Sequence, residues 1–399
     1  MSLILALCQR AVGGDTASAS ARQLLDSIRV FEREATPGGK MGRYRINANT
    51  SSQDVVRGIA DGTPFVSLRK RYLHHPDTQS RLIPLARIEA LLVQPLAQAM
   101  QDLLGERLRC ETRVARVNLS QGEFYSYDDN HRLIGRSRSL VLCCGAREHP
   151  LAELALLSAH WEGSARFLLR DSSDGLPLGE GPIVIIGASH SAFSCAWRLL
   201  HDPCFAEIVN GRDIILLQRR RRIKLRCTPQ FAARHNVAYD PERDICPDSG
   251  IVYRNGGLRK DAKRLYLQIR DGEETRVRIQ AMTSLQEQQP LLRQAGLILQ
   301  ATGFTPAWPR LERDGITLDV GDPSQRGELR NLADGRIVSG LFGMGLGLNI
   351  LPDGAVHGEA SFKGGIHGFQ SYPLSIAPGL IEYLLDHLGS LGCDRHDHQ

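Results

Sequence analysis

The sequence lacks any long hydrophobic run. No stretch of its 399 residues approaches the ~20 apolar residues that a membrane-spanning helix needs. The apolar run at residues 3–7 is too short for a signal segment, and no basic residues precede it. We therefore expect a soluble, cytoplasmic protein with no membrane partner. Hydrophobic residues make up 42% and charged residues 23% of the chain, an ordinary globular composition with room for two or three domains.

Paired cysteines are also absent. None of the nine cysteines forms a Cys-x-x-Cys pair, so no zinc knuckle and no dithiol redox centre is indicated, and we expect no metal. Neighbouring Cys143 and Cys144 end an apolar stretch, and we interpret them as packing residues because a disulfide between adjacent residues is strained. Unpatterned cysteines in an odd number are typical of reduced, cytosolic proteins.

Charge of one sign does not dominate either. The formal net charge of +5 favours anionic ligands mildly but does not by itself indicate nucleic acid. The densest basic run, residues 219–226, has no interleaved aromatic residues, so we expect no nucleic-acid partner. Whether the chain forms a homo-oligomer is left open.

A glycine-rich turn follows an apolar run in the middle of the chain. Gly187, Ser189 and Ala192 occupy the three small positions of a dinucleotide-binding turn, and a helical pattern follows. The backbone amides of such a turn bind a pyrophosphate at the start of the helix, and the hydroxyl and ring groups of His190 and Ser191 would add donors. The alternative is a strand-to-helix turn without a ligand.

The strand expected after this helix ends in Gln218 and then in arginines. An acid at that position binds the ribose hydroxyls of NADH, whereas arginine binds the 2′-phosphate of NADPH. Arg219 and Arg220 are therefore candidate NADPH ligands. A solvated basic loop and an RNA-contacting patch are the alternatives.

An altered turn of the same kind opens the chain. The apolar residues 3–7 predict a strand, small residues a turn and helix, and residues 28–32 a second strand, which together form a strand–helix–strand unit. In this register the three small positions fall on Val12, Gly14 and Ala17, and a β-branched valine does not easily adopt positive φ. The candidate dinucleotide ligands of this unit are Gly13, Gly14, Ala17 and, as the ribose-binding acid, Glu32.

Other segments have clear periodicity. Residues 83–104 predict a helix, and the alternating segments 108–114 and 123–127 predict an antiparallel meander that closes at 139–145. A linker is expected at 171–181, an inserted substrate or lid element at 239–263, and a final helix near 380–387.

The order of these motifs resembles the class B flavin monooxygenases and their N-hydroxylating relatives over nearly the whole chain. The middle fingerprint and the sequence Ala301-Thr302-Gly303-Phe304 match the family pattern, whereas an earlier Ala-Thr-Gly is altered to Cys143-Cys144-Gly145. The resemblance implies an α/β fold with two Rossmann-like dinucleotide-binding domains. A glutathione-reductase-like FAD domain (1–172 and 297–399) would hold an inserted NADPH domain (173–296).

The same resemblance implies the chemistry. NADPH would reduce FAD, the reduced flavin would trap molecular oxygen as a C4a-hydroperoxide, and this would oxidise a small nucleophilic, amine-type substrate in specialised metabolism. Lys40, after a Gly-Gly turn, and Asn47 and Asn49, on a loop that lies near the flavin in that family, are the catalytic candidates. A structural ion pair for the lysine and simple turn formation for the asparagines are the alternatives.

The remaining candidate cofactor ligands lie in glycine-rich turns or at strand ends. They are Gly39, Lys40, Met41, Val114, Gly145, Thr302, Gly303, Gly345 and Asn349. Two other functions stay open: a flavin-linked NAD(P)H oxidoreductase that inserts no oxygen, and a non-catalytic relative that has lost FAD.

Overall fold

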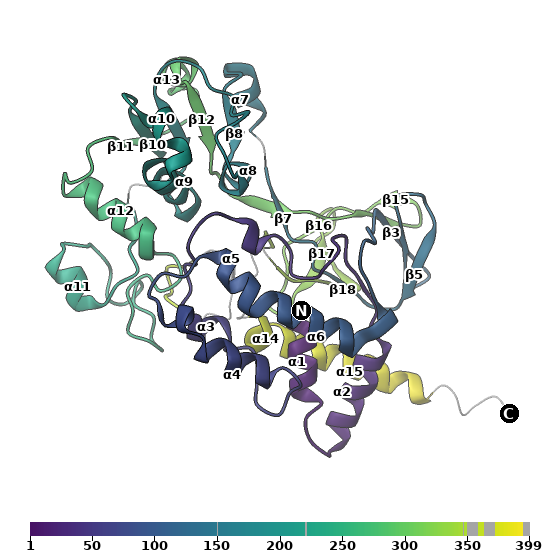
Figure 1. Ribbon diagram of the computed structural model, residues 1–399. Coiled ribbons are helices and arrows are strands. Elements are labelled where there is room, and N and C mark those ends of the chain that lie inside the picture. Colours follow the sequence, from purple (N-terminus) through teal and green to yellow (C-terminus); the bar gives the residue numbers. More distant parts are fainter. Residues whose placement is uncertain (150, 220–221, 346, 349–357, 363–371, 394–399) are drawn as a thin grey trace.

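The chain folds into two lobes of mixed α/β structure (Figure 1). The computed structural model describes residues 1–399 except 150, 220–221, 346, 349–357, 363–371 and 394–399. The smaller lobe is built on one parallel sheet, and the larger lobe contains several sheets and most of the N- and C-terminal helices. An antiparallel ribbon of β7 (Ala146–Glu148) and β13 (Phe304–Pro306) lies where the chain passes between the lobes.

Five parallel strands form the sheet of the smaller lobe, in the order β11-β10-β9-β12-β8. Its central strands are continuous apolar runs that are buried on both faces, as a parallel sheet covered by helices requires. The strands are β8 (Trp161–Gly163), β9 (Ile183–Ile186), β10 (Ile214–Gln218), β11 (Val277–Ala281) and β12 (Leu297–Gln300).

The smaller lobe contains helices that cover this sheet and one short helix, Pro229–Arg234, that lies away from it (Figure 1). They are α7 (Ala152–Leu157), α8 (Ser164–Leu169), α9 (His190–His201), η5 (Pro203–Phe205), α10 (Ala206–Val209), α11 (Pro229–Arg234), α12 (Lys260–Arg270) and α13 (Gln289–Gln294). The strand–helix–strand unit expected in this region is present as β9–α9–β10. Because β8 and β12 belong to the sheet, the sheet extends beyond the interval 173–296, and that domain boundary stays a prediction.

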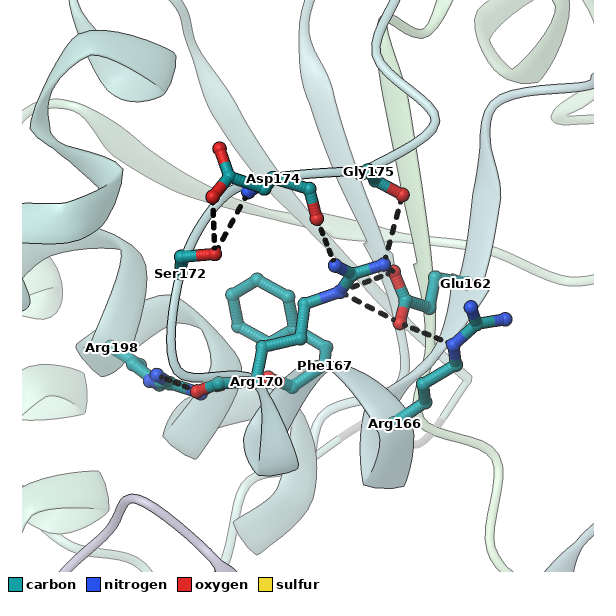
Figure 2. Close-up of polar contacts among 8 residues, drawn as sticks. All are labelled: Glu162, Arg166, Phe167, Arg170, Ser172, Asp174, Gly175 and Arg198. Carbon is teal, nitrogen blue, oxygen red and sulfur yellow. Dashed lines mark hydrogen bonds and ion pairs between the residues drawn. The ribbon is translucent and has the colours of Figure 1, made fainter.

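The linker expected at 171–181 is wrong: the segment lies within the smaller lobe, because β8 before it and β9 after it belong to the same sheet. Two arginines hold it against that sheet (Figure 2). Arg170 Nε donates to both carboxylate oxygens of Glu162 in β8 at 3.0 Å, and its terminal nitrogens donate to the carbonyls of Asp174 and Gly175. Arg198 of α9, only 3% exposed, donates to the carbonyl of Arg170. The start of the segment is therefore bound to both a strand and a helix of the smaller lobe.

The larger lobe contains three groups of strands. A five-stranded sheet has the order β15-β14-β3-β4-β5, a four-stranded sheet the order β16-β17-β18-β6, and β1 pairs with β2 alone. The strands are β1 (Val30–Phe31), β2 (Leu108–Arg109), β3 (Arg116–Ser120), β4 (Glu123–Tyr127), β5 (Leu133–Ser137), β6 (Leu140–Leu142), β14 (Arg310–Arg313), β15 (Ile316–Thr317), β16 (Val320–Gly321), β17 (Glu328–Asn331) and β18 (Ile337–Gly343).

An antiparallel meander is present, but of the segments predicted for it only 123–127 belongs to it. β3, β4 and β5 form consecutive antiparallel pairs, and the first hairpin turns at Gln121 and Gly122, both at positive φ. Residues 108–109 instead pair in parallel with β1, and β6 pairs in parallel with β18. Short alternating runs specify extended backbone but not the partner strand, so the local pattern could not separate these cases.

Helices in the larger lobe pack around its main core. They are α1 (Ser2–Arg10), α2 (Thr16–Ser27), η1 (Met41–Arg43), α3 (Ser52–Val55), α4 (Val66–His74), η2 (Pro76–Gln79), α5 (Leu85–Ile88), η3 (Glu89–Val93), α6 (Gln94–Leu104), η4 (Gly105–Arg107), α14 (Tyr372–Ser375) and α15 (Ala377–Cys393). The helix expected at 83–104 is confirmed as α5–η3–α6 with one π-helical turn, and the closing helix is confirmed within α15. Among the described residues, no helix combines the length and the apolarity needed to cross a bilayer.

The first strand of the expected N-terminal unit is wrong: residues 3–7 lie in the helix α1. A five-residue apolar run is compatible with a strand or with a helix that is buried all round. Here Ile4 to Cys8 are all buried in the main core, and α1 packs against α2, α14 and α15. The unit is therefore helix–helix–strand, with its second helix, α2, and its last strand, β1, as predicted.

This replacement leaves two strand edges unpaired. β1 pairs only with β2, and β6 pairs only with β18, so no described strand lies on the other side of either. The negative charge of Glu32, after β1, helps to raise the pKa of Cys143, after β6. From this we infer that the carboxyl ends of the two strands lie near each other. The two sheets therefore approach each other without joining.

Candidate functional site

One large cavity lies between the lobes. Its volume is about 3210 Å³, several times the roughly 300–1,000 Å³ of a typical small-molecule pocket. It is lined by residues from β1, the loop after it, β6, the β9–α9 turn and the ends of β10 and β12. It is therefore large enough for more than one ligand of dinucleotide size.

Most of the candidate residues line this cavity, although they come from distant parts of the chain. They are Glu32, Gly39, Lys40, Met41, Asn47, Asn49, Val114, Gly145, Gly187, Ser189, His190, Ser191, Arg219, Thr302, Gly303 and Gly345. Gly13, Gly14 and Ala17 are not among the lining residues. Arg220 and Asn349 lie outside the described residues.

The turn between β9 and α9 has the geometry of a phosphate-binding turn. Gly187 has φ +135°, and a Cβ there would lie 2.4 Å from the carbonyl oxygen of Ala301 at the end of β12, so only glycine fits. Ser189 occupies the N-cap of α9, but no side-chain hydrogen bond caps the helix. The turn faces the cavity and leaves the first amides of α9 without a side-chain cap.

The end of β10 carries no acid. Gln218, Arg219 and Arg222 line the cavity there. Arginine at this place can donate several hydrogen bonds to a phosphate, which is the feature that distinguishes a 2′-phosphate site from a ribose site.

The turn between α1 and α2 is a helix connection. Asp15 caps α2 by accepting from the backbone amide of Ser18 at 2.8 Å, and Gly13 has φ +128°. The Arg22 guanidinium donates to the carbonyls of Ala11 and Gly13 at 2.7 and 3.0 Å. The small residues at this turn thus have a structural explanation.

Glu32 nevertheless keeps the position expected of a ribose-binding acid. It follows β1, lines the cavity and accepts a hydrogen bond from the backbone amide of Glu34 at 2.9 Å. Cys143 and Cys144 are both exposed, so the packing role expected for them is wrong. Desolvation by the surrounding protein still raises the pKa of Cys143, and desolvation together with Cys143 raises the pKa of Cys144 to about 12. Both cysteines are free thiols, and both line the cavity.

Loop 37–50 connects the two lobes by hydrogen bonds. Asn47 Nδ2 donates to Asp261 Oδ2 of α12 at 2.7 Å, and Lys260 Nζ donates to the Thr50 carbonyl at 3.0 Å. The Asn47 side chain is therefore already held by a carboxylate of the other lobe, while Asn49 lines the cavity two residues further on. The catalytic roles of Lys40, Asn47 and Asn49 stay predictions.

The segment 239–263 contributes lining residues that the sequence did not single out. Arg254, Asn255, Gly256, Leu258 and Arg259 all face the cavity. The segment was expected as a substrate or lid element from its composition, but it has no helical or strand period that could identify individual side chains. Its acidic and arginine-rich composition was the only sequence feature that pointed to a binding role for this segment.

Positive charge dominates the wall. The described acids on it are Glu32, Glu34 and Asp314. The described cations come from both lobes and are Arg29, Arg33, Lys40, Arg57, Arg113, Arg136, Arg138, Arg147, Arg219, Arg222, Lys224, Arg254, Arg259, Arg310 and Arg313. A cavity with this surplus favours anionic ligands.

Comparison with known proteins agrees with the architecture. No family model matches the chain. Structurally it is similar to an ornithine hydroxylase from Pseudomonas aeruginosa, with TM-score 0.58 and 14% identity over 97% of this chain and 96% of that chain. It is also similar to an L-lysine 6-monooxygenase from Pseudomonas syringae, with TM-score 0.55 and 16% identity over 97% of each chain. The chain has the fold of these monooxygenases.

Two further similarities concern ligands of the relatives. An ornithine N-hydroxylase from Kutzneria sp. 744, described with reduced FAD, NADP+ and L-ornithine, has TM-score 0.54 and 13% identity over 97% of this chain and 96% of that chain. In sequence, 219 residues are 26% identical to a CMP-5′-(3-aminopropyl)phosphonate hydroxylase from Streptomyces rubellomurinus. That match spans 51% of this chain and half the length of the relative. The expected mixed α/β fold, similar to that of monooxygenase structures, is thus confirmed, whereas the division into two Rossmann-like domains stays a prediction.

Proposed function

We propose that the protein is an FAD- and NADPH-dependent monooxygenase that acts on a small, amine-type nucleophile. One observation carries the proposal: residues expected to bind two different dinucleotides, from both lobes, line one continuous cavity. The proposed flavin-binding part comprises 1–172 and 297–399, and the proposed NADPH-binding part comprises 173–296. A flavin bound there would supply oxygen activation, and the nicotinamide would supply the hydride.

The nicotinamide side fits well. The buried strand β9, the turn at Gly187 and the uncapped start of α9 form a strand–turn–helix unit whose backbone amides suit a pyrophosphate. Arg219, after β10, is placed to bind a 2′-phosphate, which favours NADPH over NADH.

The flavin side fits in part. Glu32 would bind the ribose, and Gly145, Gly303 and Gly345 present bare backbone to the cavity at positive φ, where a Cβ would meet no atom within 4 Å. The expected phosphate-binding turn does not fit, because the α1–α2 connection does not line the cavity. This mismatch favours the second candidate function, a nicotinamide-binding protein that holds flavin weakly or not at all.

The substrate class is supported by the relatives. The proteins of similar fold are named for hydroxylation of ornithine and lysine, and the sequence relative for a 3-aminopropylphosphonate ester. All of these substrates carry an amine at the end of a short chain. In the proposed reaction Asn49 and Lys40 would orient the amine and its oxidant by hydrogen bonds, and the Asn47–Asp261 bond would hold the loop in place.

Three measurements test the proposal. Purified protein should be yellow or should bind added FAD, NADPH should reduce the flavin without oxygen, and readmitted oxygen should give hydroxylated amine rather than only hydrogen peroxide. A Glu32→Gln variant should bind FAD about tenfold more weakly, because a charged acceptor is lost, whereas Glu106→Gln, at an exposed glutamate outside the cavity lining, should not. Protein that refuses FAD but binds NADPH would overturn the oxygenase and support the second candidate.

A further inference from the structure

A group of cations lies on the cavity wall at the start of α12, away from the arginine that follows β10. Arg259 lines the cavity next to Arg254. Its backbone amide donates to His190 Nε2 at 3.1 Å, which places it beside the β9–α9 turn. Lys260, the next residue, reaches across to the Thr50 carbonyl. The group therefore lies between the nicotinamide-side turn and the loop of the larger lobe.

The Arg259 side chain is not fully satisfied by the protein. Its Nη2 donates to the Arg254 carbonyl at 2.5 Å, but its Nε is buried and has no hydrogen-bond partner. Burial and the positive charge of Arg226 lower its pKa to about 10, so the group is cationic at neutral pH but is held in an unfavourable environment. A buried donor without an acceptor costs about 1–3 kcal/mol, and more when it is charged.

The nearby acids do not neutralise this charge. Glu359 is 3% exposed, and its carboxylate accepts from the backbone amides of Asn255 and Gly256. Asp54 accepts from the Ser51 hydroxyl at 2.7 Å and pairs with Arg57. Among the described residues, no ion pair includes Arg259, whereas Arg254 pairs with Asp248 at 3.6 Å.

We propose that Arg259, assisted by Arg254, forms a binding site for a phosphate or phosphonate group. A tetrahedral oxyanion in the cavity can accept from several guanidinium nitrogens at once, and its negative charge would stabilise the cation that burial disfavours. It would also offset the repulsion among the neighbouring cations. The site lies on the same cavity as Lys40 and Asn49.

Two ligands could provide this group, and both have the same chemistry. One is a phosphate of the nicotinamide dinucleotide, because the Arg259 backbone contacts His190 of the phosphate-binding turn. The other is an anionic group on the amine substrate, which would make the substrate an aminoalkyl phosphonate or phosphate. The second source depends on the proposed function, whereas oxyanion binding itself does not.

Equilibrium binding separates these possibilities without turnover. Calorimetry on the full chain would measure 3-aminopropylphosphonate, n-butylamine and NADP+ as separate probes. The unsubstituted protein should bind the phosphonate at least tenfold more tightly than butylamine, or bind NADP+ with an affinity that depends on Arg259. Arg259→Gln should weaken binding of one or both phosphorus-containing probes about tenfold. Arg264→Gln, on the exposed side of the same helix, should leave both unchanged.

The pattern of loss identifies the source. Loss confined to NADP+ assigns the site to the dinucleotide, and loss confined to the phosphonate assigns it to the substrate; either result supports the site. Unchanged binding of both probes by a folded Arg259→Gln variant would overturn it. If that variant does not fold, Arg259→Met keeps much of the aliphatic packing but removes the charge, and unchanged binding of both probes there would overturn the site equally. Because flavin reduction is measured separately, a failed oxygenase assay does not affect this result.

Discussion

The β9–α9–β10 unit and the α1–α2–β1 unit contain similar small-residue turns, but only the first has a strand in front of its turn. β9 lies between two parallel strands, is fully buried and directs its turn into the cavity. In the second unit a helix, α1, precedes the turn instead of a strand. The residues of that turn cap α2 and accept hydrogen bonds from Arg22. We therefore expect a bound pyrophosphate at the first turn and not at the second, because only the first follows a strand that places it at the edge of a sheet.

The largest expected effect comes from substituting glycine in each of the two turns. Gly187→Ala would place a methyl group 2.4 Å from the Ala301 carbonyl at a φ of +135°. We expect a loss of about 3 kcal/mol in the free energy of unfolding and loss of NADPH binding. Gly14→Ala is the matched control, because nothing lies within 4 Å of its added methyl group. Chemical denaturation and NADPH titration of both variants measure the contrast; equal effects would contradict it.

The comparison between the two units can also be tested by adding a strand in front of α1. A copy of residues 182–189 joined ahead of Ser2 would add an apolar strand and a glycine-rich turn before α1. If it pairs with the open edges of β1 and β6, its amides would gain access to the cavity, and FAD should bind about tenfold more tightly. A Gly-Ser segment of the same length is the control. Equal FAD affinity of the two fusions would show that these edges do not accept a strand.

A smaller effect is expected at the strand end that lacks an acid. Arg219→Gln should raise the KM for NADPH about tenfold, because a charge-assisted hydrogen bond to the 2′-phosphate is lost, and should leave the KM for NADH nearly unchanged. Steady-state oxidation of both coenzymes measures the ratio. A parallel rise for both would place the arginine elsewhere on the coenzyme.

The smallest effect belongs to the cap of α2. Hydrogen bonds from Ser18 hold the pKa of Asp15 below its usual value. The stabilisation is therefore present above the unfolded-state pKa near 3.8 and is lost as pH falls through the lower folded-state value. Asp15→Asn keeps the cap but removes this titration. Its Tm should fall less than that of the unsubstituted protein as the pH is lowered through this range, and NADPH binding at neutral pH should be unchanged.

The sequence predicted the smaller lobe better than the larger one for a physical reason. Residues 183–186 and 214–217 are uninterrupted branched or leucine runs, which a parallel sheet buries on both faces, so composition and period agree. Residues 3–7 offered the same kind of run without that context. Whether such a run becomes a strand depends on neighbouring strands far away in sequence, and the local pattern contains no information about them.

The sequence predicted cavity residues best at positions where a dinucleotide-binding unit requires one particular kind of side chain. Glu32 after β1 and Gly187 after β9 follow from the needs of ribose and pyrophosphate, and both line the cavity. Gly13 and Gly14 were predicted to bind a dinucleotide, but they do not line the cavity. Glycine is equally common in connections between helices, so its presence alone could not separate the two roles. Arg259 could not be anticipated, since its environment depends on Arg254, His190 and the loop at Thr50, which only the folded chain brings together.

The ribbon of β7 and β13 has a mechanical consequence. Both passages of the chain between the lobes run through this antiparallel pair, and Gly145 and Gly303 stand directly before its two strands. Twisting one lobe against the other would bend the two passages together, with the pivot beside the cavity wall. Widening of the entrance would then be coupled to the backbone of these two glycines, which themselves line the cavity.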